Sequence, residues 1–402
     1  MGDFFQPGVV TTLHRLRKNS LDRRETELEF FSRYNPIALV LPSLYCELKE
    51  KALKTIVSEI QKMKYITQVI VTLGRAKEKE FEHAKEFFSV LPQETIVIWN
   101  DGERVRSLYH ILTKNDISAG EDGKGRSVWM AFGYVLASEK SKVIVVHDCD
   151  IFSYDREFLA RLCYPVVNPN LGYEFCKGYY SRVTNKIHGR VTRLFMTPLV
   201  RALQRMLGYI PFLVYLDSFR YPLAGEFSMI ADLARINRIP WDWGLEIGVL
   251  SEMFRNCSLR RICQVDLTDN YDHKHQQLSP GDPGLGLLRM SIDIAKNLFR
   301  NLASEGIDLS ESQLKILKAT YLRTAQETIT KYHDDAAING LNFDRHEEEE
   351  AVEAFTRGIE IAGKAFVEDP LSIPLIPNWS RVTSAIPDFL EKLKNAVDDD
   401  NT

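Results

Sequence analysis

The sequence predicts an α/β fold in which a mostly parallel sheet is covered by helices on both faces. Short aliphatic runs alternate with helical stretches between residues 36 and 146, which is the order of parallel strands joined by helical crossovers. Each run is apolar throughout, as in strands that are buried on both faces. From about residue 285 the pattern is amphipathic helix alone, so we also expect an α-helical C-terminal appendage.

The predicted elements follow in a regular order along the first part of the chain. Residues 9–34 are charged and helix-prone, and they predict a leading helical arm. Strands are then predicted at 37–42, 66–73, 95–99 and 142–146. Helices are predicted between them at about 47–63, 77–91, 104–112 and 126–139. Because ligands bind beyond the carboxyl ends of parallel strands, the segments that follow the strands are candidate site segments.

The second part of the chain is less regular and ends in helices. Residues 160–280 mix loops with short strands and helices. Ser310 and Gln313 form a capping box, and apolar residues then recur at helical spacing. We expect the acidic tail, residues 397–402, to be disordered. The chain divides into an N-terminal helical arm (1–35), a sheet domain (36–285) and a helical C-terminal extension (286–402).

Composition limits the class of protein. Hydrophobic residues make up 45% and charged residues 26% of the 402 residues, as in ordinary globular proteins, and the net charge is −4. We expect no nucleic-acid partner and no membrane association, because nothing global attracts polyanions and no apolar run approaches about 18 residues. The start of the chain is not of the signal-peptide type. The six cysteines include no C-x-x-C pair, so we expect free thiols and a cytoplasmic location.

Two carboxylates follow the strand predicted at 142–146. Asp148 and Asp150 flank Cys149, and residues two apart on an extended segment point to the same side. Like charges this close repel unless a cation lies beside them, and Mg²⁺ typically binds through one or two carboxylates plus substrate phosphates. The alternative is a solvated pair of loop acids, because D-x-D alone is weak and also occurs at Asp398–Asp400. Only the first pair follows a buried strand, and we expect Cys149 to pack into the core.

Two loops hold further candidates. Residues 120–129 form a glycine-rich loop with Lys124 just before a helix, and such a loop can bring backbone N–H groups and an ammonium close to a phosphate. The G-K-[ST] signature of a P-loop is absent, so a flexible turn is the alternative. Residues 271–276 place His273 and His275 on one side of an extended segment. They are either groups that bind a metal or a diphosphate, or part of an exposed polar loop.

Three more stretches suit an anion and a sugar. Arg190 follows Gly189 and precedes Thr192, and an arginine beside a hydroxyl suits a phosphate or carboxylate. A solvated basic turn is the alternative. Glu226 and Glu246 each lie beside glycine in an apolar setting, where a carboxylate needs a polar partner. Sugar hydroxyls are suitable partners for both.

In their order along the chain, these stretches resemble the retaining GT-A glycosyltransferases that make glucosyl-3-phosphoglycerate or mannosyl-3-phosphoglycerate. The matching stretches are "LPSLYCEL" (41–48), "GKG" (123–125), "HDCDI" (147–151), "GRVTRL" (189–194), "PLAGEFS" (222–228), "GLEIGVL" (244–250) and "DHKHQ" (272–276). The resemblance covers about residues 36–285. It implies a GT-A fold, which is a Rossmann-like α/β domain, for that part of the chain.

The resemblance also implies roles for individual residues. The loop that binds the base and ribose would contain Pro42, Ser43, Leu44 and Glu47. Lys124 would lie near the diphosphate, Asp148 would bind the ribose or donor sugar, and Glu246 would bind donor-sugar hydroxyls. Asp150 and His273 would hold the metal. The acceptor phosphate would contact Gly189, Arg190 and Thr192, with His275 nearby. The catalytic residues implied by the resemblance are Asp148, Asp150, Glu246 and His273. We name no protein general base and no covalent nucleophile.

The predicted reaction is transfer of glucose from a nucleotide sugar to the 2-hydroxyl of 3-phosphoglycerate, for glucosylglycerate synthesis. The donor would be a UDP-, GDP- or ADP-hexose and the cofactor Mg²⁺ or Mn²⁺, in a homodimeric enzyme. Three alternatives stay open at this point. They are a mannosyl-3-phosphoglycerate synthase that uses GDP-mannose, a sugar-phosphate nucleotidyltransferase, and a non-catalytic nucleotide-sugar sensor. The nucleotidyltransferase is disfavoured because "LPSLYCEL" (41–48) lacks a glycine- and arginine-rich loop.

Overall fold

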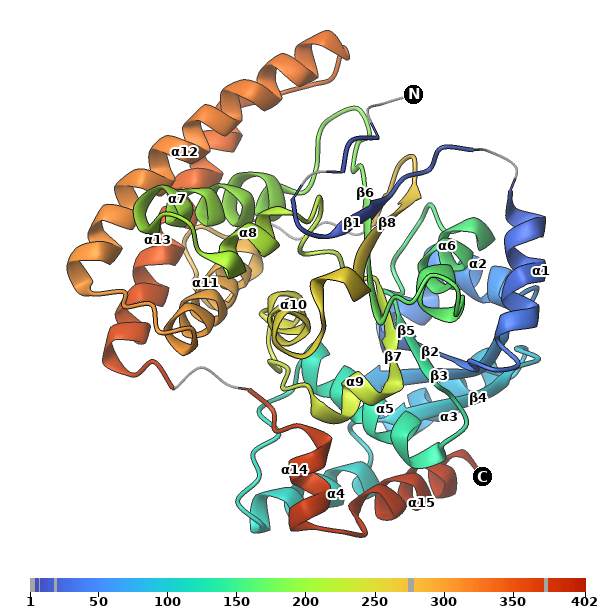
Figure 1. Ribbon diagram of the computed structural model, residues 1–402. Coiled ribbons are helices and arrows are strands. Elements are labelled where there is room, and N and C mark those ends of the chain that lie inside the picture. Colours follow the sequence, from blue (N-terminus) through green and yellow to red (C-terminus); the bar gives the residue numbers. More distant parts are fainter. Residues whose placement is uncertain (1–3, 7, 18–19, 274–277, 372–374) are drawn as a thin grey trace.

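A computed structural model of the chain describes residues 4–6, 8–17, 20–273, 278–371 and 375–402. Its centre is an eight-stranded sheet in the order β1-β8-β6-β7-β5-β2-β3-β4 (Figure 1). The strands are β1 (Thr11–Leu13), β2 (Ile37–Leu44), β3 (Ile66–Gly74), β4 (Glu94–Trp99), β5 (Val143–Val146), β6 (Phe175–Tyr180), β7 (Phe227–Ile230) and β8 (Ile262–Thr268). Neighbouring strands are parallel except for β7, which runs antiparallel to both β5 and β6. The predicted mostly parallel sheet is therefore confirmed.

Helices cover both faces of the sheet. The helices of the first part are α1 (Leu21–Phe31), α2 (Lys51–Ile60), α3 (Glu78–Phe88), α4 (Glu103–Lys114), α5 (Lys124–Ser138), α6 (Arg156–Val167), α7 (Thr197–Leu207), α8 (Pro211–Asp217), α9 (Ala231–Ile236) and α10 (Leu245–Asn256). Side chains of β2 alternate between two apolar cores: Leu39 packs with α2, α3 and α6, and Val40 packs with α4, α5 and α10. This is why the strands read as continuous apolar runs.

The predicted N-terminal helical arm is only partly helical. Helix α1 occupies Leu21–Phe31, but residues Thr11–Leu13 form strand β1, which pairs with the edge of β8. Thr11 lies opposite Cys263 in this parallel pair. The segment is too short for its sequence pattern to show a strand, and the exposed edge of β8 supplies the partner.

The C-terminal extension forms two groups of helices. They are α11 (Gly286–Ser304), α12 (Glu311–Ile338) and α13 (Arg345–Glu368), followed by α14 (Trp379–Ala385) and α15 (Phe389–Asn401). The first group packs together beside α7, and the second lies against α4 and α5 on the far side of the molecule (Figure 1). The capping box of Ser310 and Gln313 at the start of α12 is confirmed.

The acidic tail is ordered, contrary to the sequence prediction. Residues 397–401 complete α15. Asn401 exchanges two hydrogen bonds of 2.9 Å with the backbone of Val97, and the Tyr134 hydroxyl donates to Asp398 over 2.7 Å. These tertiary contacts outweigh the weak local preference of an acidic terminus. Among the described residues, no helix has the length and apolar character to span a membrane.

Candidate active site

The candidate residues gather where the sheet topology brings chain segments to one edge. The segments that follow β2, β5, β6 and β8 leave the sheet at the carboxyl ends of its parallel strands. Strand β7 is antiparallel, with Phe227 opposite Val146, so the residues before Phe227 lie beside those that follow β5. Gly225 and Asp148 are therefore neighbours, although 77 positions separate their numbers.

An ion-paired cluster occupies this edge. Lys124 is the first residue of α5, and its Nζ lies 2.6 Å from Oδ1 of Asp148 and 3.2 Å from Oε1 of Glu246. Burial alone would lower the pKa of Lys124, but the two carboxylates outweigh burial and raise it. Burial likewise opposes ionisation of Asp148, and the charge of Lys124 keeps the pKa of Asp148 below its usual value. Lys124 and Asp148 therefore both stay charged near neutral pH.

Glycines make this close approach possible. A Cβ at Gly225 would lie 2.6 Å from Oδ2 of Asp148 and 2.8 Å from Nζ of Lys124. In the glycine-rich loop, a Cβ at Gly125 would lie only 1.9 Å from the carbonyl oxygen of Pro240. The loop is thus neither a P-loop nor a loose turn: its glycines let the start of α5 pack against the segment that leads to Glu246.

Asp150 and His273 face each other beside this cluster. Oδ2 of Asp150 lies 3.5 Å from Nδ1 of His273, and a bridge between Ile151 and His273 fixes the two segments together. Two ligands at about 2.1 Å from one Mg²⁺ or Mn²⁺ lie at most about 4.2 Å apart, so this separation fits a shared cation. No cluster of three or more protein ligands occurs among the described residues. Such a site suits a cation that is also held by a diphosphate.

The predicted nucleotide loop lies at the end of β2. Pro42, Ser43 and Leu44 are the last three residues of strand β2, and Glu47 follows in a 3₁₀ turn. One oxygen of Glu47 accepts from the Ser43 hydroxyl and from the Leu44 backbone N–H, each over 3.1 Å. Burial raises the pKa of Glu47 to about 7. The carboxylate therefore shapes the loop itself, and contact of Glu47 with a ribose stays a prediction.

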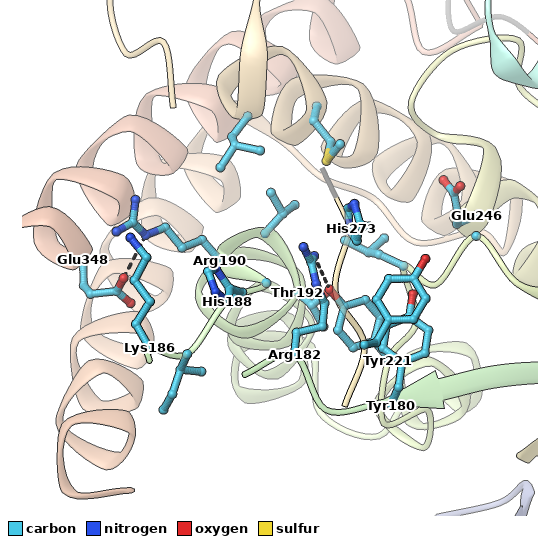
Figure 2. Close-up of a pocket in the computed structure, with 18 of the residues that line it drawn as sticks. Tyr180, Arg182, Lys186, His188, Arg190, Thr192, Tyr221, Glu246, His273 and Glu348 are labelled. Carbon is cyan, nitrogen blue, oxygen red and sulfur yellow. Dashed lines mark hydrogen bonds and ion pairs between the residues drawn. The ribbon is translucent and has the colours of Figure 1, made fainter. Parts of the chain in front are cut away.

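A cavity of about 620 Å³ opens from the Lys124 cluster. Glu246 lies near one end of the view, and Arg190, Lys186 and Glu348 lie near the other (Figure 2). Gly189 has a φ of +77°, which favours glycine, and the π-helical turn Val191–Met196 follows at once. Such turns are frequent at functional sites. The cavity thus joins Lys124, Asp148 and Glu246 to the predicted acceptor residues. The other predicted donor-side residues do not line it: Pro42, Ser43, Leu44, Glu47 and Asp150.

Two residues of the acceptor loop, Arg190 and Thr192, line this cavity. Oγ1 of Thr192 is buried and has no hydrogen-bond partner within the described part of the chain. Nε of Arg190 donates to Glu348 over 2.8 Å, and its Nη2 donates to Glu347 over 2.5 Å. These two hydrogen bonds leave guanidinium hydrogens of Arg190 without a partner in the described part of the chain. His275 lies outside the described residues, so its contact with the acceptor stays a prediction.

Glu226 lies beneath the cavity and does not line it. Its side chain is fully buried, and its two oxygens accept hydrogen bonds of 2.8 and 2.7 Å from Tyr180 and Tyr271. The two tyrosine rings stack with centroids 3.7 Å apart. We therefore do not place Glu226 among the donor-binding residues. Cys149 packs into the core, as predicted.

The sequence reasoning missed several residues of the cavity. Arg182 donates a hydrogen bond of 3.1 Å to the Tyr221 hydroxyl, and both side chains line the cavity with Lys186. Arg182 and Lys186 lie in the same basic loop as Arg190, and that local accumulation of cations was a usable signal. Glu347 and Glu348 belong to a run of four glutamates on α13, and nothing in the sequence relates this run to the acceptor loop.

Comparison with known proteins identifies full-length relatives. No protein-family model matches the chain. The chain is 49% identical over 402 residues to the glucosyl-3-phosphoglycerate synthase of Persephonella marina, and the match covers 100% of both chains. It is 40% identical to the glucosyl-3-phosphoglycerate synthase of Methanococcoides burtonii, over 98% of this chain and 97% of that protein.

Solved structures show the same fold. The glucosyl-3-phosphoglycerate synthase of Mycobacterium tuberculosis, in complex with Mn²⁺, UDP-glucose and phosphoglyceric acid, has a TM-score of 0.53 at 22% identity, over 75% of this chain and 89% of that one. The mannosyl-3-phosphoglycerate synthase of Rubrobacter xylanophilus has a TM-score of 0.54 at 22% identity, over 75% and 84%. The predicted fold class is confirmed by these glycosyltransferase neighbours.

Proposed function

The chain belongs to the glucosyl-3-phosphoglycerate synthase family, and from this membership we propose that it transfers glucose from a nucleotide sugar to the 2-hydroxyl of 3-phosphoglycerate. The full-length match at 49% identity carries the proposal. The structure adds a cavity with one end suited to a sugar diphosphate and the other suited to a small anion. Family membership argues against a nucleotidyltransferase and a non-catalytic sensor.

The donor half of the cavity would bind the nucleotide sugar. Lys124 supplies a positive charge beside the diphosphate, which becomes more negative as the glycosidic bond breaks. Glu246, which is paired with Lys124 over 3.2 Å, would accept hydrogen bonds from sugar hydroxyls. Asp148 would contact the ribose or the sugar from the other side of the lysine. The nucleotide loop at Pro42–Leu44, with Glu47, would hold the base and ribose.

Asp150 and His273 would hold Mg²⁺ or Mn²⁺. Their separation of 3.5 Å fits two ligands of one cation. A divalent cation at this place would supply charge neutralisation for the diphosphate leaving group. The cations and donors named in the relatives' structures, Mn²⁺ or Mg²⁺ with UDP or UDP-glucose, make UDP-glucose the first donor to test.

The acceptor half would bind 3-phosphoglycerate through Gly189, Arg190 and Thr192. The open hydrogens of the Arg190 guanidinium and the buried Thr192 hydroxyl would donate to its phosphate or carboxylate. Lys186 lines the same end of the cavity and adds positive charge. Binding of an acidic metabolite by a protein with net charge −4 requires such a local cluster.

We assign no covalent nucleophile. Both oxygens of Glu226 accept from tyrosine hydroxyls, and the side chain is fully buried. Asp148 and Glu246 are held by one lysine and support the donor. Retention of the anomeric configuration would then follow from attack by the acceptor hydroxyl on the face that the diphosphate leaves. In this scheme the departing phosphate oxygen takes the acceptor proton.

One assay tests the proposed function. Purified protein is incubated with 3-phosphoglycerate, Mg²⁺ or Mn²⁺, and UDP-glucose, ADP-glucose, GDP-glucose or GDP-mannose, and the release of nucleoside diphosphate and the product mass are measured. We expect release only when 3-phosphoglycerate is present, with a glucose donor preferred. Preference for GDP-mannose would make the protein a mannosyl-3-phosphoglycerate synthase. Pyrophosphate formed from a nucleoside triphosphate and glucose 1-phosphate would contradict glycosyl transfer.

Three further parts of the proposal concern organisation. The division into residues 1–35, 36–285 and 286–402 is kept, although β1 attaches the first part to the sheet. A cytoplasmic location is supported by six cysteines that are all free thiols. Assembly as a homodimer stays a prediction, and the molar mass in solution tests it.

A further inference from the structure

The acceptor loop is held by the C-terminal extension as well as by the sheet domain. The turn between α12 and α13 reaches this loop, because Asn342 pairs with Lys186 in a parallel bridge and its N–H donates to the carbonyl oxygen of Asn185 over 2.8 Å. The Tyr321 hydroxyl of α12 donates to the carbonyl oxygen of Leu194 over 2.8 Å. Helix α12 and the turn that follows it therefore hold the backbone on both sides of Arg190.

The side chains of the loop depend on the same helices. The Arg193 guanidinium lies 5.1 Å above the ring of Tyr332 in α12, which is a cation–π contact. Its Nε donates to the carbonyl oxygen of His188 over 3.1 Å and its Nη1 pairs with Glu348. Arg193 is only 5% exposed. It therefore links the backbone of the loop to one carboxylate of α13.

Glu348 is the point where these contacts meet. Its two oxygens engage two different arginines: Oε1 accepts from Nε of Arg190 over 2.8 Å, and Oε2 pairs with Arg193. Glu348 is 4% exposed, so water competes little for its hydrogen bonds with the two arginines. The neighbouring Glu347 also contacts Arg190, but its side chain is 51% exposed. Figure 2 shows Glu348 beside Arg190 at the end of the cavity.

We propose that Glu348, contributed by the C-terminal extension, is a positioning residue of the acceptor site. It fixes the Arg190 guanidinium by its Nε edge, so that the remaining hydrogens point to the anion of 3-phosphoglycerate. Through Arg193 it also holds the loop backbone at His188. The inference rests on the proposed function, because it takes Arg190 as an acceptor-binding residue. It also gives the C-terminal helices a role in acceptor recognition.

The test compares Glu348→Ala, Glu348→Gln and Glu348→Asp with the wild-type enzyme. The control Glu353→Gln lies on the same helix, at an exposed position. We expect Glu348→Ala to raise the KM for 3-phosphoglycerate about tenfold or more, because one partner of a buried charge pair is lost. The KM for the nucleotide sugar should stay within about twofold, since the donor half is untouched. Glu348→Asp keeps the carboxylate and should recover part of the loss.

A double-mutant cycle separates positioning from mere structural support. If Glu348 acts on the acceptor mainly through Arg190, adding Glu348→Ala to an Arg190→Ala enzyme should raise the KM for 3-phosphoglycerate by only about threefold or less, the part carried by Arg193 and the loop backbone, instead of the roughly tenfold rise expected in the wild-type enzyme. Independent, multiplicative losses would overturn the proposal. An equal loss for donor and acceptor, or an unchanged acceptor KM in folded Glu348→Ala, would overturn it too. Thermal unfolding of each variant identifies the folded ones, and Glu348→Gln serves if Glu348→Ala does not fold.

Failure of the proposed function gives a different result. A wild-type enzyme that releases nucleoside diphosphate equally with and without 3-phosphoglycerate overturns the proposed function, and the inference with it. A wild-type enzyme with acceptor-dependent release, whose Glu348 variants bind 3-phosphoglycerate normally in calorimetric titrations, overturns the inference alone.

Discussion

At the donor end of the cavity a lysine lies between two carboxylates, and at the acceptor end a carboxylate lies between two arginines. Lys124, Asp148 and Glu246 all lie within residues 36–285, and each lies near the end of a regular element at the sheet edge. Arg190 also lies within residues 36–285, but Glu348 is 158 positions away on α13. The donor end is therefore built within residues 36–285, whereas the acceptor end is completed by α13.

The difference has a chemical reason. The donor brings a diphosphate, which needs fixed cations, and a sugar, which needs carboxylates, so a mixed cluster serves both. The acceptor is a small anion, so its end of the cavity needs a net positive charge with a defined direction. A buried counter-ion behind the arginine supplies the direction. It also lowers the net positive charge, because Arg182, Lys186 and Arg190 line the cavity together with three carboxylates, Asp344, Glu347 and Glu348.

The substitution with the largest expected effect disrupts the donor half alone. Asp150→Ala removes the carboxylate that faces His273 at 3.5 Å, and turnover should fall by about 10³-fold or more, because charge stabilisation at the leaving group is lost. Calorimetric titration with Mn²⁺ and nucleoside diphosphate should show weakened binding. Binding of 3-phosphoglycerate should be retained. A variant with normal Mn²⁺-dependent turnover would remove Asp150 from the metal site.

The substitution with the next largest expected effect disrupts the acceptor half alone. Arg190→Ala should raise the KM for 3-phosphoglycerate about 100-fold, since a charge-assisted contact is lost and buried Glu348 loses a partner. The KM for the nucleotide sugar should change little. Steady-state kinetics with each substrate varied in turn checks this, with Arg190→Lys as the charge-retaining comparison. An unchanged KM for 3-phosphoglycerate would remove Arg190 from the acceptor site.

A smaller effect tests the packing of the donor cluster. In Gly225→Ala the new Cβ would lie 2.6 Å from Asp148 and 2.8 Å from Lys124, so the ion pair must shift. We expect kcat/KM for the nucleotide sugar to fall about tenfold, because small displacements at a reacting centre are costly. The KM for 3-phosphoglycerate serves as the internal control. If it rises as much as the donor KM, the two halves are not separable in the way described.

Acid should destabilise the donor half through His147. This residue is fully buried between the carbonyl oxygen of Asp148, 2.9 Å away, and the Tyr154 hydroxyl, 3.3 Å away. Burial lowers its pKa to about 4, whereas the unfolded value is about 6.5. The unfolded chain therefore binds the proton more tightly, so this contribution to stability is complete above about pH 6.5 and is lost as pH falls toward 4.

We expect the low pKa of His147 to reduce the free energy of unfolding by about 1 kcal/mol when the pH falls from 7 to 5.5. Chemical denaturation at both pH values measures the change. His147→Asn keeps a group that can donate to Asp148 and cannot titrate, so its stability should depend less on pH than that of the wild type. Arginines at the acceptor end stay charged over this range. An identical pH slope for the variant would contradict the assignment.

The smallest expected effect concerns the exposed partner of Arg190. Glu347→Gln removes a negative charge whose side chain is 51% exposed, and exposed ion pairs contribute little. The KM for 3-phosphoglycerate should fall by about twofold, because one carboxylate no longer competes for the guanidinium. Kinetics at low and moderate salt measures the change. A large increase in KM would mean that Glu347, and not only Glu348, orients Arg190.

Local pattern was sufficient to predict strand β5 and the acids that follow it. Strand β5 and the acids after it are visible in the sequence because a strand buried on both faces must be continuously apolar and must end where polar groups begin. The capping box of Ser310 was readable for a similar reason, since it lies within four residues. The order of the acidic tail could not be predicted in this way, because α15 is held by residues far away in the sequence, such as Val97.

The sequence by itself therefore determined the α/β class, the strands of the first part, the acids at the end of β5 and the family. These depend on periodicities and motifs within short segments. Only the tertiary structure decided that Lys124 joins Asp148 to Glu246, that Glu226 is turned to two tyrosines, and that Glu348 lies behind Arg190. Each of these contacts joins segments far apart in the chain. Their partners are set by strand order and helix packing, which short-range patterns do not specify.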